Sequence, residues 1–442
     1  MLLKKGEVKM AHSSKGVLFQ LNEHCPGCYK VTLTIPQKLT SKLYAEAVLA
    51  QEKETETYGF SKGKTPKYYI EQNYKTNLAE HLKSFLFHYF ALSGLYKNIC
   101  EKKIILANEP ELESIELDDN NDARFSFLID TVNDIEKGDW KNIQFKAPQR
   151  KNYKDIDRQV ETFLEQEVSS DGNSPEEIAV GDWVCFDISL LSSDKDTIFE
   201  DLQETLWIKI SNEEVDKEMR TLLVGKKVGD IITTQAQTLQ EYFSDKIDTQ
   251  YTFVLQIQAI AAHTLLALEN IKKHFTLKTS KDLHRKLIEV YSFRNDISQR
   301  RETIEKLFKQ LIGFYKFKPR PFLIEQQEMR VLEAVQRNPD YYVYKSQKNF
   351  KQIVHQLAER QLKEMIIIDL ISGTDNIKAN LEDVTCYLTL TQRARTNMFV
   401  YFGIPSTKVK GQEMPVPHSV VEHIVLREKT LNHIIHTLTR KK

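Results

Sequence analysis

Alternating hydrophobic and polar residues near the start of the chain predict a small sheet, and longer runs with helical spacing follow it. The runs VLFQL and YKVTLTIP are typical of strands, and Pro26-Gly27 between them supplies a turn. One helix is predicted from about Leu39 and a second, LAEHLKSFLFHYFALSGLYKNIC, after Asn77. The run RFSFLIDTV at 124–132 returns to a strand pattern. Residues 1–147 are therefore expected to form an α+β domain.

A change of pattern after Pro148 indicates a linker and then a second domain. Residues 148–176 contain a polar helical run, DIDRQVETFLEQEV, and end in SSDGNSPEE, whose Ser, Gly, Asn and Pro content is typical of a linker. From Gly181 the short runs DWVCFDISLL, ETLWIKI, GDIITTQ and YTFVLQIQAI are strand-like and separated by turns. Residues 177–262 are therefore expected to form a small β-rich domain.

The rest of the chain, residues 263–442, is helical in pattern and predicts an all-α domain. The predicted helices are a long one capped by Ser280, one after Pro321, one that ends near Gly373, and one from about Ser419. The segment 401–418, YFGIPSTKVKGQEMPVPH, departs from this pattern with three prolines and two glycines, and no function is assigned to it. The fold class is thus a multidomain α+β protein.

Composition narrows the functional classes. The chain has 442 residues, of which 62 are basic and 62 acidic, so contact with nucleic acid or an anionic surface must come from a local patch. No apolar run reaches the roughly 18 to 20 residues that span a bilayer. The start of the chain, whether at Met1 or Met10, lacks a signal-peptide pattern. Five cysteines suit a reducing compartment. We expect a cytoplasmic protein with no membrane contact.

The stretch YGFSKGKTP at 58–66 is a candidate binding loop. Three lysines and no acid lie between Thr57 and Ile70, a local charge of +3, and two glycines allow tight bends. Phe60 is expected at the tip, where it would fill a pocket on a partner while the lysines meet phosphates or acidic groups. The alternative is that Phe60 folds back into its own core. Thr65 is expected to cap the next helix and Pro66 to occupy its first position.

Candidate metal and redox residues do not form a complete site. The pair Cys25 and Cys28 in HCPGC could be half of a zinc site or a redox dithiol, but no second CxxC or HxxxH partner exists in the sequence. Two cysteines beside a Pro-Gly hairpin turn is the simpler interpretation. The histidine pairs His81 and His88, and His433 and His436, are expected on helix surfaces. No metal ligand and no cofactor is predicted.

The domain order, together with the loop, resembles the trigger factor family of bacterial ribosome-associated chaperones. That family has a ribosome-binding domain, a domain of the FK506-binding-protein type, and a helical substrate-binding domain completed by the linker. GFSKGKTP is similar to the family's docking motif, Gly-Phe-Arg-Lys-Gly-x-x-Pro. The matching positions are Gly59, Phe60, Lys62, Gly63 and Pro66, with Ser61 in place of the arginine and Lys64 within the loop. The resemblance implies that these residues bind the ribosome.

The same resemblance implies a proline pocket in the middle domain. The pocket residues it indicates are Phe186, Asp187, Phe199, Met219, Tyr242 and Phe243. The family's Pro-Gly-aromatic-Glu stretch is replaced by Lys217-Glu218-Met219-Arg220, which puts charge where the pocket needs turn residues. We expect peptidyl-prolyl isomerase activity to be weak, since a charged pocket is costly to desolvate around a proline. A spacer or an extra binding surface is the alternative.

The resulting hypothesis is a ribosome-associated chaperone that shields nascent and unfolded polypeptides near the exit of the growing chain. No GxxxxGK[ST] phosphate loop, GxSxG or HExxH motif is present, which disfavours an ATP-driven or hydrolytic mechanism. Two alternatives stay open: a prolyl isomerase whose flanking domains deliver substrate, and a redox or zinc protein that uses Cys25 and Cys28. The sequence also leaves open a homodimer of the free protein.

Overall fold

The computed structural model describes most of the chain, with gaps. The described residues are 9–12, 17–25, 27–107, 109–117, 122–131, 135, 138–150, 154–166, 168–169, 177–192, 197–198, 203–244, 250–263, 266–292, 297–392, 396–404 and 406–440. Phe199, the following Glu200 and most of the predicted linker end lie outside them.

The first part of the chain forms an antiparallel five-stranded sheet covered by helices. The strand order is β1 (Lys9–His12), β2 (Leu18–Cys25), β3 (Cys28–Ile35), β5 (Ala123–Asp130) and β4 (Glu111–Glu116). The helices are α1 (Gln37–Glu54), α2 (Lys67–Asn73), α3 (Lys75–Leu86), a π-helix (Phe87–Ala91) and α4 (Leu92–Glu101). Alternate residues of β3 are buried beneath α1 and α3, as the period of two requires. The predicted α+β character is confirmed.

The second sheet is also five-stranded and recruits its last strand from a distant segment. Its order is β14 (Val416–Pro417), β8 (Glu204–Lys209), β7 (Trp183–Leu191), β10 (Thr252–Ala261) and β9 (Ile231–Thr234). A short 3-10 turn (Glu214–Asp216), α6 (Lys217–Leu223) and α7 (Gln237–Phe243) complete it. The four strands predicted from the sequence are present, whereas β14 comes from the segment that had no assigned role.

The remaining described residues are mainly helical. The helices are α5 (Lys154–Gln166), α8 (Leu268–His274), α9 (Ser280–Val290), α10 (Gln299–Phe314), α11 (Pro321–Gln336), α12 (Tyr341–Lys345), α13 (Phe350–Asp375), α14 (Leu381–Thr391) and α15 (His418–Arg440). Single 3-10 turns cover Trp140–Asn142 and Asn397–Phe399, and β6 (Val168–Ser169) pairs with β11 (Leu266–Ala267). The long helix predicted after Ser280 was wrong in two respects. It divides into α9 and α10, and its cap is Thr279, whose side chain accepts a hydrogen bond from the Asp282 N–H.

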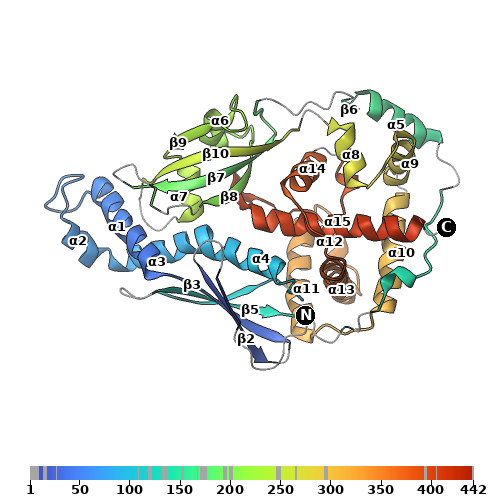
Figure 1. The fold of residues 1–442 in the computed structure, drawn as a ribbon, viewed down its shortest axis with the longest axis horizontal. Helices are drawn as coiled ribbons and strands as arrows, with labels where there is room; N and C mark the ends of the chain where they lie inside the picture. The colour runs from blue at the N-terminus through green and yellow to red at the C-terminus, as the bar shows by residue number, and fades with distance from the viewer. Residues whose placement is uncertain are drawn as a thin grey trace.

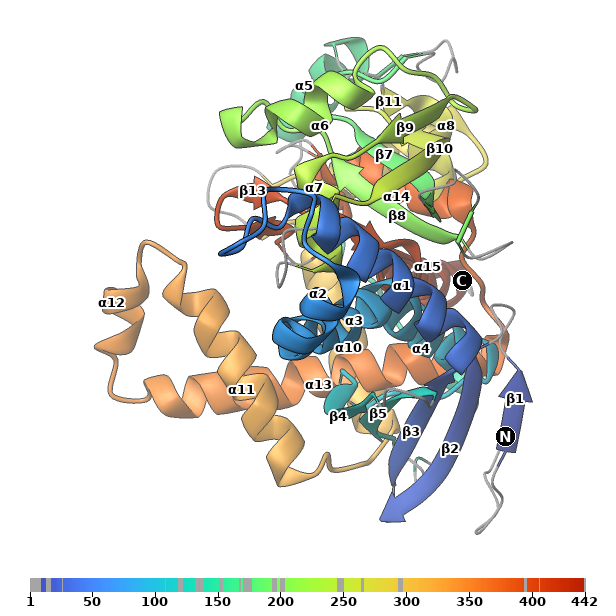
Figure 2. The same cartoon turned by 90° about the vertical axis from the view of Figure 1, so that its left-hand side faces the viewer.

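The parts of the molecule pack around α15, which contacts α4 of the first part and the β8 edge of the second sheet (Figure 1). One continuous hydrophobic core joins residues of the first sheet, its helices and the second sheet. In Figure 2, α11, α12 and the start of α13 project away from the body as an arm. The domain limits expected from composition stay a prediction. No helix in the described part of the chain is long and apolar enough to cross a membrane.

Candidate functional site

The candidate docking loop is built from two consecutive tight turns. In the first, the Phe60 N–H donates to the Thr57 carbonyl at 2.9 Å, and in the second, the Lys64 N–H donates to the Ser61 carbonyl at 3.0 Å. Gly59 and Gly63 have φ of +93° and +75°, a region that side chains other than glycine rarely adopt. A Cβ on Gly59 would meet no atom within 4 Å. Backbone conformation, not space, therefore requires glycine there.

The two aromatic residues of the loop differ in exposure. Tyr58 lies in the middle of the first turn and is fully exposed, with a relative accessibility of 102%. Phe60 is half-buried, and its ring packs against Tyr69 of α2 with centroids 5.5 Å apart. The expectation of Phe60 at the tip was wrong, because Tyr58 is the residue presented to solvent. Its place directly before a glycine in a turn was the sequence signal for this.

The end of the loop also differs from expectation by one residue. Helix α2 begins at Lys67, Pro66 is its N-cap, and no side chain caps it. Thr65 is buried, and its hydroxyl lies 3.4 Å from the Thr57 hydroxyl, so it stabilises the base of the loop instead of the helix. Ser61 and the three lysines at 62, 64 and 67 are exposed. The loop thus presents an aromatic ring and several cations on the surface.

The CPGC turn has a structural explanation. The backbones of Cys25 and Cys28 lie opposite one another at the end of the β2–β3 hairpin, and Gly27 has φ of +75°. A Cβ on Gly27 would lie 2.2 Å from Nη2 of Arg320, whose Nη1 lies 3.2 Å from an Asp130 carboxylate oxygen. Arg320 directly precedes α11, so the hairpin tip is one place where the arm meets the first sheet, and the contact of Gln326 with Glu111 of β4 is another. The hairpin prediction is confirmed.

The residues that resemble a proline pocket are buried side chains of the second sheet and its helices. Phe186 and Phe243 are completely buried, and Met219 and Tyr242 nearly so, at 2% and 8% relative accessibility. The Asp187 carboxylate accepts hydrogen bonds from the Thr205 hydroxyl at 2.6 Å and the Gln258 amide at 2.7 Å. The Asp187 carboxylate therefore makes its hydrogen bonds to side chains of the same sheet.

Helix α3 and the π-helix of the first domain cover α7. The rings of Phe85 and Phe243 stack with centroids 4.7 Å apart, and the His88 and Tyr242 rings lie 5.2 Å apart. The Ser84 hydroxyl donates to the Phe243 carbonyl at 2.9 Å. The aromatic residues that would contact a proline are thus in contact with α3 and the π-helix.

Two further hydrogen bonds cross the same contact. The Tyr89 hydroxyl donates to the Ile188 carbonyl at 3.0 Å, and Nε2 of His81 lies 2.7 Å from the Tyr251 hydroxyl. Burial lowers the pKa of His81 to about 3 and also lowers the pKa of His88. Both rings are therefore neutral at physiological pH. The expectation that His81 and His88 lie on a helix surface was wrong, because both face this contact.

The charged residues that replace the family's turn stretch have local structural roles. They form the first turn of α6, with Met219 directed inward. Nη1 of Arg220 donates to the carbonyls of Ser211 and Glu213 at 3.1 and 2.8 Å. A Glu218 carboxylate oxygen accepts from the Gln237 N–H at 2.8 Å. The charged groups of Glu218 and Arg220 thus bind backbone groups next to α6 and α7 and lie outside the buried aromatic cluster.

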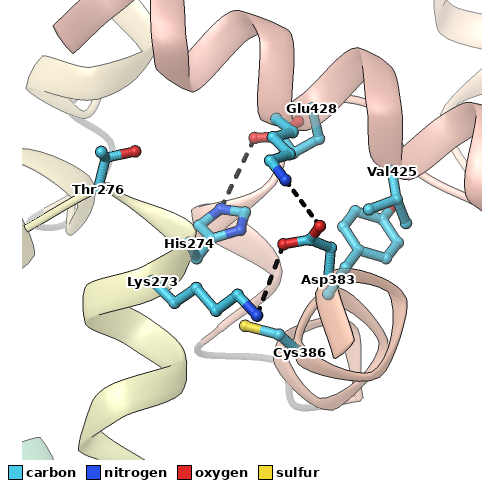
Figure 3. Close-up of a pocket in the computed structure, with 9 residues that line it drawn as sticks. Lys273, His274, Thr276, Asp383, Cys386, Val425 and Glu428 are labelled. Atoms are coloured by element: carbon cyan, nitrogen blue, oxygen red, sulfur yellow. Dashed lines mark hydrogen bonds and ion pairs between the residues drawn. The ribbon is translucent and has the colours of Figure 1, made fainter. Parts of the chain in front are cut away.

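A separate cavity of about 210 Å³ lies between α8, α14 and α15 (Figure 3). In it Lys429 Nζ and Asp383 Oδ2 are 2.7 Å apart, and Glu428 is almost completely buried. The Glu428 carboxylate accepts from the backbone N–H groups of Tyr401 and Phe402 at 2.8 and 3.0 Å, and from Arg300 at 3.0 Å. These polar groups satisfy one another, so the cluster fixes the chain after α14 to α15.

Among the described residues, one group could approach a metal ion together. It consists of Asp157, Glu161 and His284, on α5 and α9, and contains no cysteine. Nε2 of His284 lies 3.2 Å from an Asp157 carboxylate oxygen, a distance that an ordinary ion pair explains. The group gives no support to the zinc or redox hypothesis for Cys25 and Cys28.

Comparisons with known proteins agree on one family. Residues 22–166 match the model of the bacterial trigger factor protein. The trigger factor of Rhodopirellula baltica is 24% identical over 374 residues, which cover 80% of this chain and 76% of that protein. The trigger factor of Geobacter metallireducens is 22% identical over 381 residues, which cover 80% and 85%.

A solved structure of the trigger factor chaperone, described for promiscuous substrate recognition in folding and assembly, covers 97% of this chain and 99% of its own, with 16% identity and a TM-score of 0.36. The match to the family model includes the candidate docking loop, and the relatives cover 80% of the chain. Over most of its length the chain is therefore similar to trigger factors.

Proposed function

We propose that this protein is a ribosome-associated chaperone that docks through residues 57–67 and shields nascent and unfolded polypeptides. The observation that carries the proposal is the loop itself, in which two glycine-dependent turns present Tyr58 beside exposed lysines. Exposed aromatic side chains and cations suit a ribosomal surface, where protein pockets and phosphates lie side by side. Gly59, Phe60, Ser61, Lys62, Gly63, Lys64 and Pro66 are the proposed docking residues, and Tyr58 joins them.

The arm supports the holding activity. Large apolar side chains remain exposed on and beside α11, α12 and α13: Phe314, Phe322, Met329, Tyr342, Val343, Tyr344, Ile353 and Leu357. They are interspersed with charged residues along a part of the molecule that projects away from its body (Figure 2). Scattered apolar contacts of this kind bind many unfolded sequences weakly, as a chaperone requires.

Prolyl isomerisation is a minor activity in this proposal. Phe186, Asp187, Met219, Tyr242 and Phe243 remain the proposed pocket residues, together with Phe199. The burial of Tyr242 and Phe243 against α3 and the π-helix leaves little access for a peptide in this arrangement. We expect peptide turnover well below that of a family member with an open pocket.

The partners and compartment follow from the same proposal. The ribosome near the polypeptide exit and nascent chains are the expected partners, in the cytoplasm and without a cofactor. A homodimer of the free protein is a further expectation, which sedimentation velocity tests through the dependence of the sedimentation coefficient on concentration.

Co-sedimentation with ribosomes across a salt series tests the docking. We expect a slope of log K against log salt of about −1 to −3, for two or three neutralised phosphates. A variant with Tyr58→Ala, Phe60→Ala and Lys62→Ala should lose roughly 2 kcal/mol or more of binding free energy.

The matched control removes an aromatic residue and a lysine from the arm, Tyr342→Ala with Lys345→Ala. This variant should sediment with ribosomes like the wild type while it suppresses client aggregation less well. Equal ribosome binding by the triple variant and the wild type would refute the docking assignment. Loss of docking in the arm variant would move the ribosome contact to the helical part.

A further inference from the structure

The segment 406–417, which links α14 to α15, lies against the middle domain. It begins with a short hairpin of β12 (Lys408–Val409) and β13 (Gln412–Glu413), in which Lys410 and Gly411 both have positive φ, +53° and +90°. The chain then forms β14, which pairs antiparallel with the free edge of β8, Val416 opposite Trp207 and Pro417 opposite Leu206. The segment therefore adds a strand to a sheet that is about 200 residues distant in sequence.

Polar contacts fix the segment at two more places on that domain. The backbone N–H of Glu413 donates to the buried carboxylate of Asp216 at 3.0 Å, directly before α6. The Gln412 amide donates to the Thr238 hydroxyl at 2.8 Å, in the first turn of α7. The contacts thus reach the two helices that carry Met219 and Tyr242. An edge strand with side-chain anchors for the residues that precede the paired segment has the properties of a peptide-binding surface.

The side chains of the segment alternate as in a bound extended peptide. Glu413, Pro415 and Pro417 are buried, whereas Gln412, Met414 and Val416 between them are only partly buried. Pro417 lies opposite Leu206, which belongs to the core of the second sheet, so Pro417 and Pro415, two positions earlier, lie on the core side of the edge. Proline lacks an N–H and is tolerated in an edge strand, where no ladder hydrogen bond is lost. The surface is consequently shaped for extended segments of the X-Pro-X-Pro kind.

We propose that the edge of β8, with Asp216 and Thr238, is a binding surface for extended segments that carry proline at alternate positions, and that residues 412–417 are its intramolecular occupant. An incoming peptide of this pattern must displace the occupant, whose effective concentration is of order millimolar because it is tethered. The occupant leads directly into α15, and Nε1 of Trp207 donates to Nδ1 of His418 at 2.9 Å. This surface is distinct from the ribosome-docking loop, and the proposal does not depend on docking.

The test uses the full chain and a fluorescein-labelled peptide with the sequence GQEMPVPH, residues 411–418. In Val416→Pro the only N–H group of β14 is removed while the extended conformation is kept. Val416→Ala, which keeps the N–H, is the matched control. By fluorescence anisotropy, Val416→Pro should bind the peptide at least tenfold more tightly than the wild type and the alanine variant. A peptide with alanine in place of both prolines should bind at least tenfold more weakly to Val416→Pro.

Two results would overturn the proposal: equal peptide affinity of all three proteins, or equal affinity of Val416→Pro for the proline and alanine peptides. If Val416→Pro does not fold by circular dichroism, hydrogen exchange on the wild-type protein decides instead. Saturating unlabelled peptide should then accelerate amide exchange of residues 412–414 and leave that of β7 unchanged. No acceleration would contradict displacement of the intramolecular segment. Ribosome co-sedimentation is expected to be unaffected throughout, which separates this proposal from the docking assignment.

Discussion

The candidate docking loop, residues 57–67, and the contact of α7 with α3 and the π-helix, called the α7 contact below, use aromatic residues in opposite ways. Tyr58 and Phe60 lie on either side of a glycine, and the loop leaves Tyr58 wholly exposed. Tyr242 and Phe243 end a helix, and both rings are buried against Phe85, His88 and Tyr89 of another part of the chain. The same residue types are therefore exposed to solvent in one region and buried in an internal contact in the other.

The backbone context explains the difference. Positive φ at Gly59 and Gly63 turns the chain away from the core, and the neighbouring lysines favour water. In α7, Leu239, Tyr242 and Phe243 share a face with helical spacing, which requires an apolar neighbour. The contact with α7 should therefore contribute to the stability of the fold, whereas the loop should contribute to binding alone.

The largest effect is expected from Phe85→Ala. Phe85 is completely buried and its ring lies 4.7 Å from Phe243 and 5.4 Å from Tyr251, measured between centroids. Truncation removes the transfer free energy and leaves a cavity, which costs about 3 to 5 kcal/mol for a buried phenylalanine. Urea denaturation followed by circular dichroism measures the loss in the free energy of unfolding.

Tyr58→Ala is the matched control for stability, since Tyr58 has no core contact to lose. It should change the free energy of unfolding by less than about 0.5 kcal/mol. If Phe85→Ala lowers the free energy of unfolding by less than about 1 kcal/mol, the contact between α3 and α7 does not persist in solution.

The second effect distinguishes the two aromatics of the loop. If Tyr58 is the contacting residue, Tyr58→Ala should weaken ribosome binding by about 2 kcal/mol, and Tyr58→Phe should bind nearly as well as the wild type. Phe60→Ala should act indirectly, because it removes the packing against Tyr69 that holds the turn. Ribosome co-sedimentation of the three variants measures this. A greater loss in Phe60→Ala than in Tyr58→Ala would restore Phe60 as the contacting residue.

Low pH should lower the free energy of unfolding because His81 is buried in the contact between α3 and the second sheet. Burial lowers the folded-state pKa of His81 to about 3, while the unfolded chain has the ordinary value near 6.5. As pH falls below 6.5 the unfolded state binds a proton first. The stability is therefore complete above pH 6.5 and falls by about 1.4 kcal/mol for each pH unit between 6.5 and about 3.

Urea midpoints at pH 7.5 and 5.5 measure this contribution. The wild type should lose about 1.4 kcal/mol more than His81→Gln between the two values, since glutamine carries no titrating group. An acid dependence of His81→Gln equal to that of the wild type would exclude a neutral, buried His81.

The sequence predicted the elements with strong local patterns and missed contacts made over long distances. Alternation identified β2, β3, β5 and the four strands from β7 to β10, because one face of each must be buried. The positive φ values at Gly59 and Gly63 agree with the predicted turns. By contrast, the pairing of Val416 with Trp207 has no local signal, since β14 is only two residues long and one of them is a proline.

The site errors have the same origin. Phe60 and Tyr58 are separated by one residue, and only the packing of Phe60 on Tyr69 determines which is exposed. His81 and His88 have a helical spacing that fits a surface as well as an interface, and the tertiary contact with Tyr251 and Tyr242 decides between them. The caps at Thr65 and Ser280 were misplaced by one residue, which is the usual uncertainty of helix ends.

The smallest expected effect separates the charged part of the loop from its aromatic part. Lys64 is exposed next to Gly63 and lies in a stretch without acids. If it contacts a ribosomal phosphate, Lys64→Ala should reduce the magnitude of the salt slope by about 1 and weaken binding by less than about 1 kcal/mol at physiological salt. Tyr58→Ala should lower the affinity equally at all salt concentrations, because stacking or pocket filling releases no counterion. Co-sedimentation of both variants from low to high salt measures the two slopes. An unchanged salt slope in Lys64→Ala would assign the phosphate contacts to Lys62 and Lys67. A reduced salt slope in Tyr58→Ala would mean that Tyr58 positions the lysines instead of contacting the ribosome itself.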